Sequence, residues 1–396
     1  MMRTYALFFV LLLVAGVAFA ATFRVTADLQ SALDKAQSGD TLLVAAGRFE
    51  ADPQEFVEPT CGNCQKHQTG VHASRGFLIS GKQLRILGDS NGGTVLVTKA
   101  GYGLLVLDSR GTVLENLMVT GGHRDRDGAA TDAAIVIKQS TVKIHNCTLR
   151  DNTHYYDSTI VGIGGVMIRE NSEVWLTRCR MINNTWDGVA LYRGATAMIT
   201  DCVIDSGRGA GIGVTWDATA TCLRNEISHY WKGIGSFGTA TVVARNNLVH
   251  DNLGWGIIAS GESTMIAENN TVVQNGNCGI AIWNAGTRGR MVNNISAMNG
   301  WRKEWVCPCV GFWNQESDSV GWVVAHNLVW QNSAGNVRGV DSTKFLIADP
   351  QFGDTMTFVP GVGSAALGVD STLTNGDGSP GDWGYTGGPA ARRKER

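Results

Sequence analysis

The chain contains little proline and little charge, and the charges that it has nearly cancel. Proline accounts for 7 of 396 residues, charged residues for 17%, and the formal net charge is −2. A balance so close to neutral gives no electrostatic basis for binding nucleic acid or an anionic membrane. Hydrophobic residues make up 43% of the chain, and glycine contributes 50 residues. This composition is typical of many short strands joined by tight turns, and not of a disordered chain.

The chain has one long apolar run, at the N-terminus. Arg3 precedes an apolar stretch from Tyr5 to Phe19, and Ala18-Phe19-Ala20 has the small-x-small form of a cleavage site. The run is shorter than the ~20 residues of a membrane helix, which favours a cleaved signal over an uncleaved anchor. We therefore predict a signal peptide at residues 1–20, no membrane span in the mature chain, and a secreted, periplasmic or cell-surface location.

A short pattern recurs along the chain: a polar residue, then Cys or Asn, then, after one more residue, an apolar side chain. The Cys or Asn of each copy, taken as a marker, stands at Asn116, Cys147, Cys179, Cys202, Asn225, Asn247, Asn270, Asn294 and Asn327. Most steps are 22 to 24 residues and the others are 31 to 33. A steady stride with insertions predicts a solenoid. At ~3.3 Å per extended residue, one stride makes a circuit of roughly 75 Å, enough for three short strands and three turns.

A glycine-led apolar segment follows most markers. In Gly188-Val189-Ala190-Leu191 the period of two predicts a strand with Val189 and Leu191 inward and Ala190 outward. The patterns of leucine-rich and helical repeats are missing. The markers should then stack in one column, where Asn side chains bond to the backbone along the stack. In that column the three Cys are more simply small buried hydrophobes than reactive thiols.

Both ends of the solenoid carry capping signals. Leu29, Ala32, Leu33 and Ala36 are spaced for one face of a short helix, with Asp28 at its start. With the strand-like segment at 39–47, this region resembles the N-terminal cap of pectin lyase-like proteins, and Ala348-Asp349-Pro350-Gln351-Phe352 onward resembles their closing segment.

The resemblance implies an all-β, right-handed parallel β-helix with a short N-terminal capping helix. We expect the β-helix domain at 21–385, its cap at 22–50, its closing segment at 345–385, and a flexible basic tail at 386–396. The superfamily includes lyases, hydrolases, esterases, epimerases and non-enzymatic surface proteins, so the resemblance implies the fold and not the activity.

Aromatic residues flank the glycine-led strands. The outward floor positions are small at Ala190, Gly213, Gly235 and Ala281, with Ile258 the exception. The aromatic residues expected to bind substrate are Trp186, Tyr192, Trp216, Trp231, Phe237, Trp255 and Trp283. Stacked over successive coils, they predict a shallow groove between two aromatic ridges. Flat aromatic faces suit sugar rings, although the same rings would also serve to pack against loops or neighbouring coils.

Polar residues at the same edge are the candidate catalytic groups. Asp187, Arg208 and Lys232 occupy similar positions before consecutive strands, within roughly 10 Å of one another, or two rungs. A uronate lyase needs a cation for the sugar carboxylate and a base for the C5 proton. Arg208 suits the first role and Lys232 or His229 the second. The alternative is that these charges form a solvated rim.

Cysteine and histidine gather in the insertions. Cys61, Cys64, His67 and His72 have the types and spacing of zinc ligands, but outside the cytoplasm a disulfide is the favoured explanation. Cys307 and Cys309 stand in a later insertion and are expected to pair with this loop or with each other. No cofactor is required by the sequence, and a divalent metal stays open.

These patterns favour an exported monomer that binds a polysaccharide along the aromatic groove and, if it is catalytic, cleaves it as a lyase. Two alternatives remain: a non-catalytic surface or adhesion scaffold, and a periplasmic metal-handling protein that uses Cys61, Cys64, His67 and His72.

Overall fold

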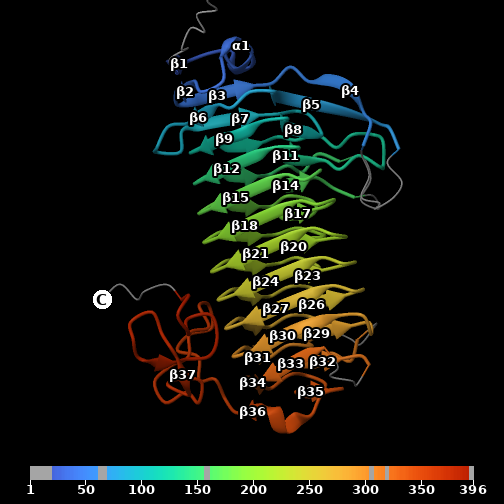
Figure 1. Cartoon of the computed structure of the whole chain (residues 1–396), viewed down its shortest axis with the longest axis vertical. Coiled ribbons are helices and arrows are strands. Elements are labelled where there is room, and N and C mark those ends of the chain that lie inside the picture. The colour runs from blue at the N-terminus through green and yellow to red at the C-terminus, as the bar shows by residue number, and fades with distance from the viewer. Residues whose placement is uncertain (1–19, 61–68, 156–160, 303–306, 317–320, 392–396) are drawn as a thin grey trace, which may run out of the picture.

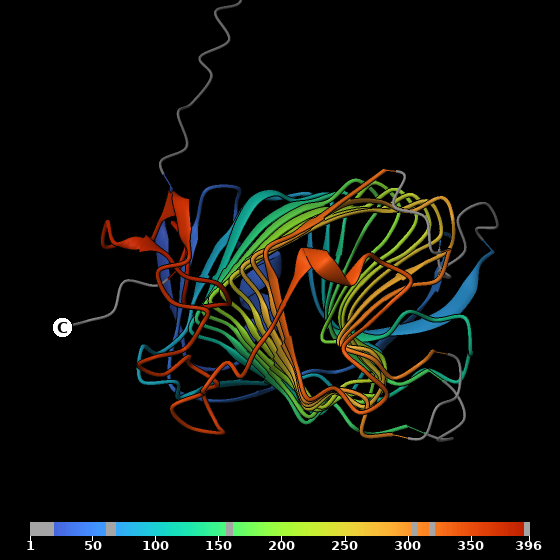
Figure 2. The same cartoon turned by 90° about the horizontal axis from the view of Figure 1, so that it is seen from below.

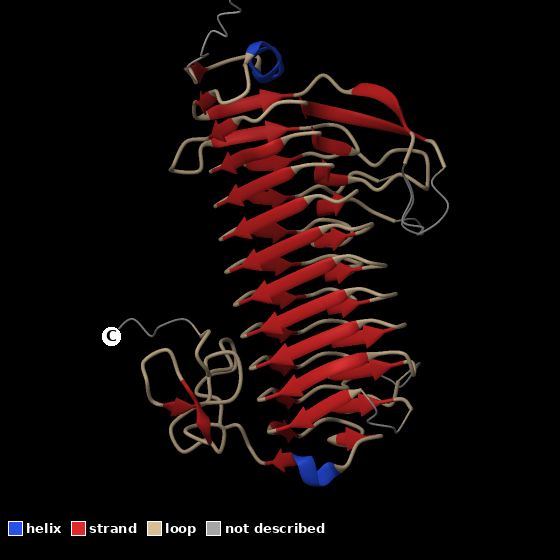
Figure 3. Cartoon of the chain, in the orientation of Figure 1, coloured by secondary structure: helices blue, strands red, loops and turns tan. Residues whose placement is uncertain are grey.

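The computed structural model describes residues 20–60, 69–155, 161–302, 307–316 and 321–391. The chain winds into a right-handed parallel β-helix, as the sequence predicted, whose coils stack along one axis (Figures 1 and 3). Each full coil contributes one strand to each of three sheets, here called sheets A, B and C. Seen along the axis, the sheets form the walls of one tube (Figure 2).

Sheet A follows the glycine-led strand of each coil. Its twelve strands are β1 (Thr22–Val25), β2 (Thr41–Val44), β6 (Arg85–Leu87), β9 (Arg110–Glu115), β12 (Thr141–His145), β15 (Glu173–Thr177), β18 (Thr196–Thr200), β21 (Thr219–Leu223), β24 (Thr241–Arg245), β27 (Thr264–Glu268), β30 (Arg288–Val292) and β33 (Trp322–Ala325). The stride of 22 to 24 residues brings equivalent positions of neighbouring strands into register, for example Thr219 with Thr241.

Sheet B follows sheet A along each coil, and in most coils two residues separate the two strands. Its strands are β3 (Gly47–Glu50), β7 (Thr94–Val97), β10 (Met118–Thr120), β13 (Thr148–Arg150), β16 (Arg180–Ile182), β19 (Val203–Asp205), β22 (Glu226–Ser228), β25 (Leu248–His250), β28 (Thr271–Val273), β31 (Ile295–Ala297), β34 (Asn327–Trp330) and β36 (Phe345–Ile347). Most of them are three residues long, with the apolar residue of the repeat in the middle, as Ile204 is in β19.

Sheet C contains the glycine-led strands. Its strands are β4 (Gln54–Glu58), β5 (Val71–Ser80), β8 (Tyr102–Leu107), β11 (Ala133–Lys138), β14 (Gly164–Arg169), β17 (Val189–Leu191), β20 (Ala210–Val214), β23 (Lys232–Ser236), β26 (Trp255–Ser260), β29 (Ile280–Trp283), β32 (Phe312–Asn314) and β35 (Val337–Arg338). Only β4 runs antiparallel among them, as a hairpin with β5.

The bend between sheets A and B has a left-handed residue in nine coils. These residues, with φ between +50° and +60°, are Asn116, Asn146, Arg178, Asp201, Arg224, Asn246, Asn269, Asn293 and His326. The marker prediction is therefore wrong by one residue at Asn116. Met118 pairs with Thr148, so Leu117, and not Asn116, stands beside Cys147. The other eight markers follow the bend directly and form one column.

The Asn markers form a buried ladder, as expected. The Oδ1 atom of Asn247 accepts hydrogen bonds from the backbone N and the Nδ2 atom of Asn225, both at 3.0 Å. The same pattern repeats up to Asn327. A second ladder, at the next corner, joins Asn252, Asn275, Asn299 and Asn332. Both satisfy polar groups inside the wall that water cannot reach.

The three Cys markers continue the first column and lie in the apolar interior. Cys147, Cys179 and Cys202 are each 1% exposed. Burial, the largest cause, raises the pKa of the Cys147 thiol well above its usual value. In the strands of sheet C, Val189 and Leu191 also point into this interior, while Ala190 belongs to a separate cluster on the outer face. The orientation predicted from the period of two is confirmed.

The N-terminal end is closed by α1 (Leu29–Lys35). Asp28 caps it by accepting a hydrogen bond from the backbone N of Ser31 at 3.0 Å, and Leu29 and Leu33 pack into the core. The capping helix and its start residue are confirmed.

The C-terminal segment folds back along the outer face of sheet B instead of only closing the last coil. After η1 (Ser342–Lys344) and β36 the chain forms a lobe with a small hairpin of β37 (Asp370–Thr374) and β38 (Pro380–Gly381), beside the solenoid in Figure 1. Phe358 and Trp383 of the lobe pack on sheet B residues such as Val273. Contact extends past the boundary expected at 385, because Arg224 donates a hydrogen bond to the carbonyl O of Ala390.

Candidate functional site

The candidate residues Asp187 and Lys232 lie on the outer face of sheet C. Val189 pairs with Ile212 and Ala210 pairs with Lys232, so Asp187, Ala210 and Lys232 occupy one column on three successive coils. Asp187 and Lys232 are thus two rungs, about 10 Å, apart along the backbone. Only the small side chain of Ala210 stands between them.

Asp187 is a buried carboxylate held by the backbone. Its Oδ1 atom accepts a hydrogen bond from the backbone N of Ala210 at 2.6 Å. Burial raises the pKa of Asp187 to about 6, against the opposing effects of this hydrogen bond and of the Lys232 charge. A β-carbon on Gly209 would collide with Oδ1 of Asp187, so that position requires glycine.

Lys232, the first residue of β23, is half-buried beside this carboxylate. Burial lowers its pKa, and the charge of Asp187 partly restores it. The ammonium group lies 5.6 Å from the centre of the Phe237 ring, and Phe237 itself covers Gly235 on the outer face. A lysine with a lowered pKa loses its proton more readily and can then act as a base.

Arg208 is close to the same group, whereas His229 is engaged elsewhere. The guanidinium carbon of Arg208 lies 5.6 Å from the Tyr155 ring centre and 5.8 Å from that of Trp186, the residue before Asp187. His229 Nδ1 instead lies 2.6 Å from Oδ1 of Asp205, the last residue of β19 in sheet B. The histidine therefore belongs to the edge of sheet B, and Lys232 is the remaining candidate base.

The aromatic residues form a connected row of rings over the C-terminal half of the same face. Ring centres are 6.0 Å apart between Trp231 and Trp255, 5.7 Å between Trp255 and Trp283, and 6.1 Å between Trp283 and Trp313. Arg302 lies over Trp231 at 4.8 Å. We call Trp231, Trp255, Trp283 and Trp313 the tryptophan row.

The floor of the expected groove is covered. Ile258 and Ala281 are 1% and 0% exposed, because the rings of the tryptophan row close over them. Trp255 is itself only 2% exposed, and Tyr192 is 8% exposed. These two rings support their neighbours and present little surface to a ligand. Trp186, Trp216, Trp231, Phe237 and Trp283 remain half-buried.

The sequence reasoning missed an ionic cluster on the same face, next to Tyr192. Glu58, at the end of β4, lies 2.5 Å from Lys138 Nζ and 2.8 Å from Arg169 Nη2. Arg193 pairs with Glu170 at 2.6 Å and donates to the carbonyl O of Thr60 at 2.8 Å. The cluster fastens the end of the β4–β5 hairpin to three coils of sheet C. Charged residues at the ends of apolar strands were the available signal.

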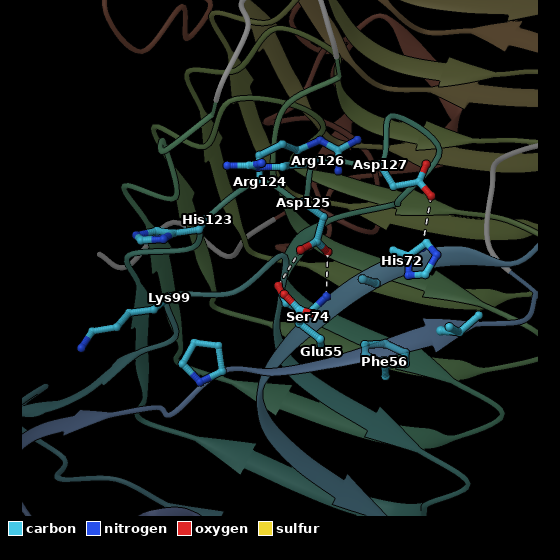
Figure 4. Close-up of a pocket in the computed structure, with 13 residues that line it drawn as sticks. Glu55, Phe56, His72, Ser74, Lys99, His123, Arg124, Asp125, Arg126 and Asp127 are labelled. Carbon is cyan, nitrogen blue, oxygen red and sulfur yellow. Dashed lines mark hydrogen bonds between the residues drawn. The ribbon is translucent and has the colours of Figure 1, made fainter.

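A hollow lies at the N-terminal end of sheet C, between the β4–β5 hairpin and the segment that follows β10 (Figure 4). Its volume is about 680 Å³, and its lining residues are Pro53, Glu55, Phe56, Val57, His72, Ala73, Ser74, Lys99, His123, Arg124, Asp125, Arg126 and Asp127. Asp125 accepts hydrogen bonds from the hydroxyl and the backbone N of Ser74, at 2.5 and 3.0 Å. The contact ties the segment to β5.

Behind this hollow, Asp132 forms a buried acidic pair with Asp125. Asp132 accepts hydrogen bonds at 2.6 Å from both Arg124 Nη1 and the backbone N of Asp125. Burial and the Asp125 charge raise the pKa of Asp132 to about 7. The carboxyl of Asp132 therefore loses its proton less readily than an exposed aspartate does.

Only some of the predicted cysteine and histidine ligands lie within the described residues. Cys61, Cys64 and His67 lie outside the described residues. The backbone N of His72 donates to Asp127 at 3.1 Å, and the ring lines the hollow. In the described part of the chain, Cys, His, Asp and Glu side chains do not gather in threes around a position for a metal ion. Cys307 lies next to Cys278, a residue that the sequence analysis did not single out, with 3.0 Å between the sulfurs.

Within the described residues, none of the helices has the length and apolar character needed to cross a membrane.

Comparisons with known proteins agree with the architecture. The family model described as a right handed beta helix region matches residues 84–215 and, overlapping, 132–296. The A-module of mannuronan C-5 epimerase AlgE4 from Azotobacter vinelandii is 14% identical, covers 81% of this chain and 93% of that chain, and gives a TM-score of 0.50. Pectate lyase Pel9A is 13% identical, covers 93% and 97%, and gives 0.53. The search of curated proteins returned no match. At these identities the likeness is one of fold.

Proposed function

We propose that this chain, which belongs to the family of right-handed β-helix regions, binds an acidic polysaccharide on the outer face of sheet C. We propose further that it removes a proton from a uronate unit there. The observation that carries the proposal is the column in which Asp187 and Lys232 lie two rungs apart, with a half-buried lysine of lowered pKa beside a buried carboxylate. Perturbed groups of this kind gather at functional sites.

The chemistry follows from the charges. Arg208 pairs with the sugar carboxylate, which makes the neighbouring C5 proton more acidic. Neutral Lys232 takes that proton, and the ammonium so formed is stabilised by the carboxylate of Asp187. In elimination, the electrons of the C5–H bond form the C4–C5 double bond and the C4–O bond breaks. The ammonium returns its proton to the leaving oxygen, so the step consumes no water.

Aromatic surfaces beside this column suit a sugar chain. Trp186 and Trp231 occupy equivalent positions two coils apart, and both remain half-buried. Their rings offer flat apolar faces for the C–H surfaces of pyranose rings, while hydroxyls bond elsewhere. Trp283, which is also half-buried, extends this surface toward the C-terminal coils.

The test is a panel of uronic-acid polysaccharides, with ultraviolet absorbance reporting unsaturated ends and sugar analysis reporting inversion at C5. Wild-type protein is expected to act on at least one, and Lys232→Ala to lose about a hundredfold or more in kcat/KM. Lys143→Ala is the control, since Lys143 is exposed on sheet A.

Binding without either product would reject the catalytic step and favour the scaffold alternative. No binding to any member of the panel would reject the polysaccharide altogether.

We further propose that the chain acts outside the cytoplasm as a monomer. Export is supported by the apolar run from Tyr5 to Phe19, which ends in the cleavage-site pattern Ala18-Phe19-Ala20. N-terminal sequencing of the exported protein should begin at Ala21, and light scattering should give the mass of one chain. An uncleaved N-terminus in the membrane fraction would contradict export by this signal.

A further inference from the structure

Cys278 and Cys307 are brought together from different coils. Cys278 precedes β29, and Cys307 belongs to the long connection between β31 and β32. Their Sγ atoms are 3.0 Å apart, and the residues are 0% and 3% exposed. Of the seven described cysteines, which are all buried, the three markers and Cys222 lie in the interior core, whereas this pair lies under the tryptophan row.

We propose that Cys278 and Cys307 form a disulfide in the exported protein. Two sulfurs at 3.0 Å reach the bond length of about 2.05 Å with a shift of about 1 Å. An oxidising compartment, such as the N-terminal signal implies, supports such bonds. The pairing differs from both pairings that the sequence suggested for Cys307.

The bond forms by thiol–disulfide exchange with a small-molecule disulfide, such as oxidised glutathione. The Cys307 thiolate attacks it, forms a mixed disulfide and releases one thiol. Cys278 then attacks Cys307 Sγ and releases the second thiol, so two electrons and two protons pass to the oxidant. The thiol of Cys278 donates a hydrogen bond to Cys307 and lowers the pKa of Cys307, and Cys307 is the more exposed of the two, so Cys307 is the attacking group.

The crosslink lies near residues that border the proposed binding surface. Arg302, five residues before Cys307, lies over Trp231 at 4.8 Å and donates to the carbonyl O of Leu253 at 3.0 Å. Trp301 beside it is 54% exposed and donates through Nε1 to the carbonyl O of Gln274 at 2.7 Å. This consequence rests on the proposed polysaccharide binding, whereas the bond itself rests only on the proposed export.

Cys309 provides the matched control. Its Sγ is 3.5 Å from the carbonyl O of Arg302 and 3.7 Å from that of Cys307. Cys309→Ser should therefore leave the crosslink intact, and Cys278→Ser should abolish it.

The experiment is peptide mapping of the full exported chain, denatured and alkylated without reduction. Wild type and Cys309→Ser should yield one peptide pair that joins residues 278 and 307, lighter by two hydrogens than the separate peptides and lost on reduction. Cys278→Ser should lack it. Alkylated Cys278 and Cys307 in unreduced wild type, or Cys307 joined to Cys309, Cys61 or Cys64, would overturn the proposal. The wild-type peptide map is sufficient to test the disulfide, even if a variant fails to fold. Its outcome does not depend on polysaccharide activity.

Discussion

Asn270 Oδ1 receives two hydrogen bonds from Asn247, one from the backbone N at 3.0 Å and one from Nδ2 at 2.9 Å. Both residues are 0% exposed. Each ladder residue thus accepts hydrogen bonds from donors of the preceding coil. Its own Nδ2 atom donates to a carbonyl O of that same coil, which for Asn270 is that of Ala244.

Replacing Asn270 should consequently destabilise the fold without touching the outer face of sheet C. In Asn270→Ala two buried donors of Asn247 and one carbonyl lose their partner, and we expect a loss of about 2–4 kcal/mol in the free energy of unfolding. Urea unfolding measures it. Asn91→Ala, at an exposed turn where only the backbone N of Asn91 donates to Asp89, should change stability by less than about 0.5 kcal/mol. Equal effects of the two changes would refute the ladder's role.

Glu58 neutralises two cations that water does not reach. The side chains of Arg169 and Lys138 are 0% and 7% exposed. Glu58→Ala leaves both without this carboxylate, so we expect a loss of about 3–5 kcal/mol in unfolding free energy. The exposed Glu173 of sheet A serves as the control in Glu173→Ala. A midpoint within error of wild type would mean that the hairpin contributes nothing to the stability of the coils beneath it.

Asp132 should make stability depend on pH. Its folded-state pKa of about 7 lies above the ordinary value of 3.8, so its contribution to stability is complete below the ordinary pKa and is lost as pH rises through 7. Thermal midpoints of wild type should therefore include a decline from about pH 4 to pH 7, which Asp132→Asn lacks. Asp127→Asn, on the same segment, should keep it. The same decline in Asp132→Asn would assign it to another group.

Asp187 should tune the pH dependence of activity. Its charge raises the pKa of Lys232 against the lowering by burial. In Asp187→Asn that charge is gone, so the rise of kcat/KM with pH should move to lower pH while the lysine still acts as base. The exposed Asp217, which accepts a hydrogen bond from the backbone N of Gly194, is the control in Asp217→Asn. An unshifted profile would contradict the pairing.

Trp231 should contribute to binding more than to stability. Its half-buried ring borders the column of Asp187 and Lys232, and Trp231→Ala is expected to weaken polysaccharide affinity about tenfold, equivalent to about 1.4 kcal/mol. Trp175→Ala is matched to it, because Trp175 is also half-buried but lies on sheet A beside Lys143. Isothermal titration measures both. Equal losses would indicate a general effect of removing a tryptophan.

What repeats along the chain could be predicted from the sequence, and what occurs once could not. The stride predicted eight of the nine markers, the inward residues Val189 and Leu191, and the common column of Asp187 and Lys232. Glu58 and Arg169 are 111 residues apart, and no period relates a hairpin in an insertion to the coil that it covers. Cys278 stayed unnoticed for the same reason. The covered floor was missed because backbone position does not fix the direction in which a tryptophan ring lies.

The left-handed residue at the A–B bend of nine coils has a further consequence. Since the corner takes the same shape at Arg224, Asn246 and Asn269, one coil of about 23 residues is a complete unit whose upper and lower edges match. Duplicating or deleting such a unit would lengthen or shorten the tube and leave its cross-section unaltered. The length of surface that the protein offers to an extended partner is therefore set by the number of coils.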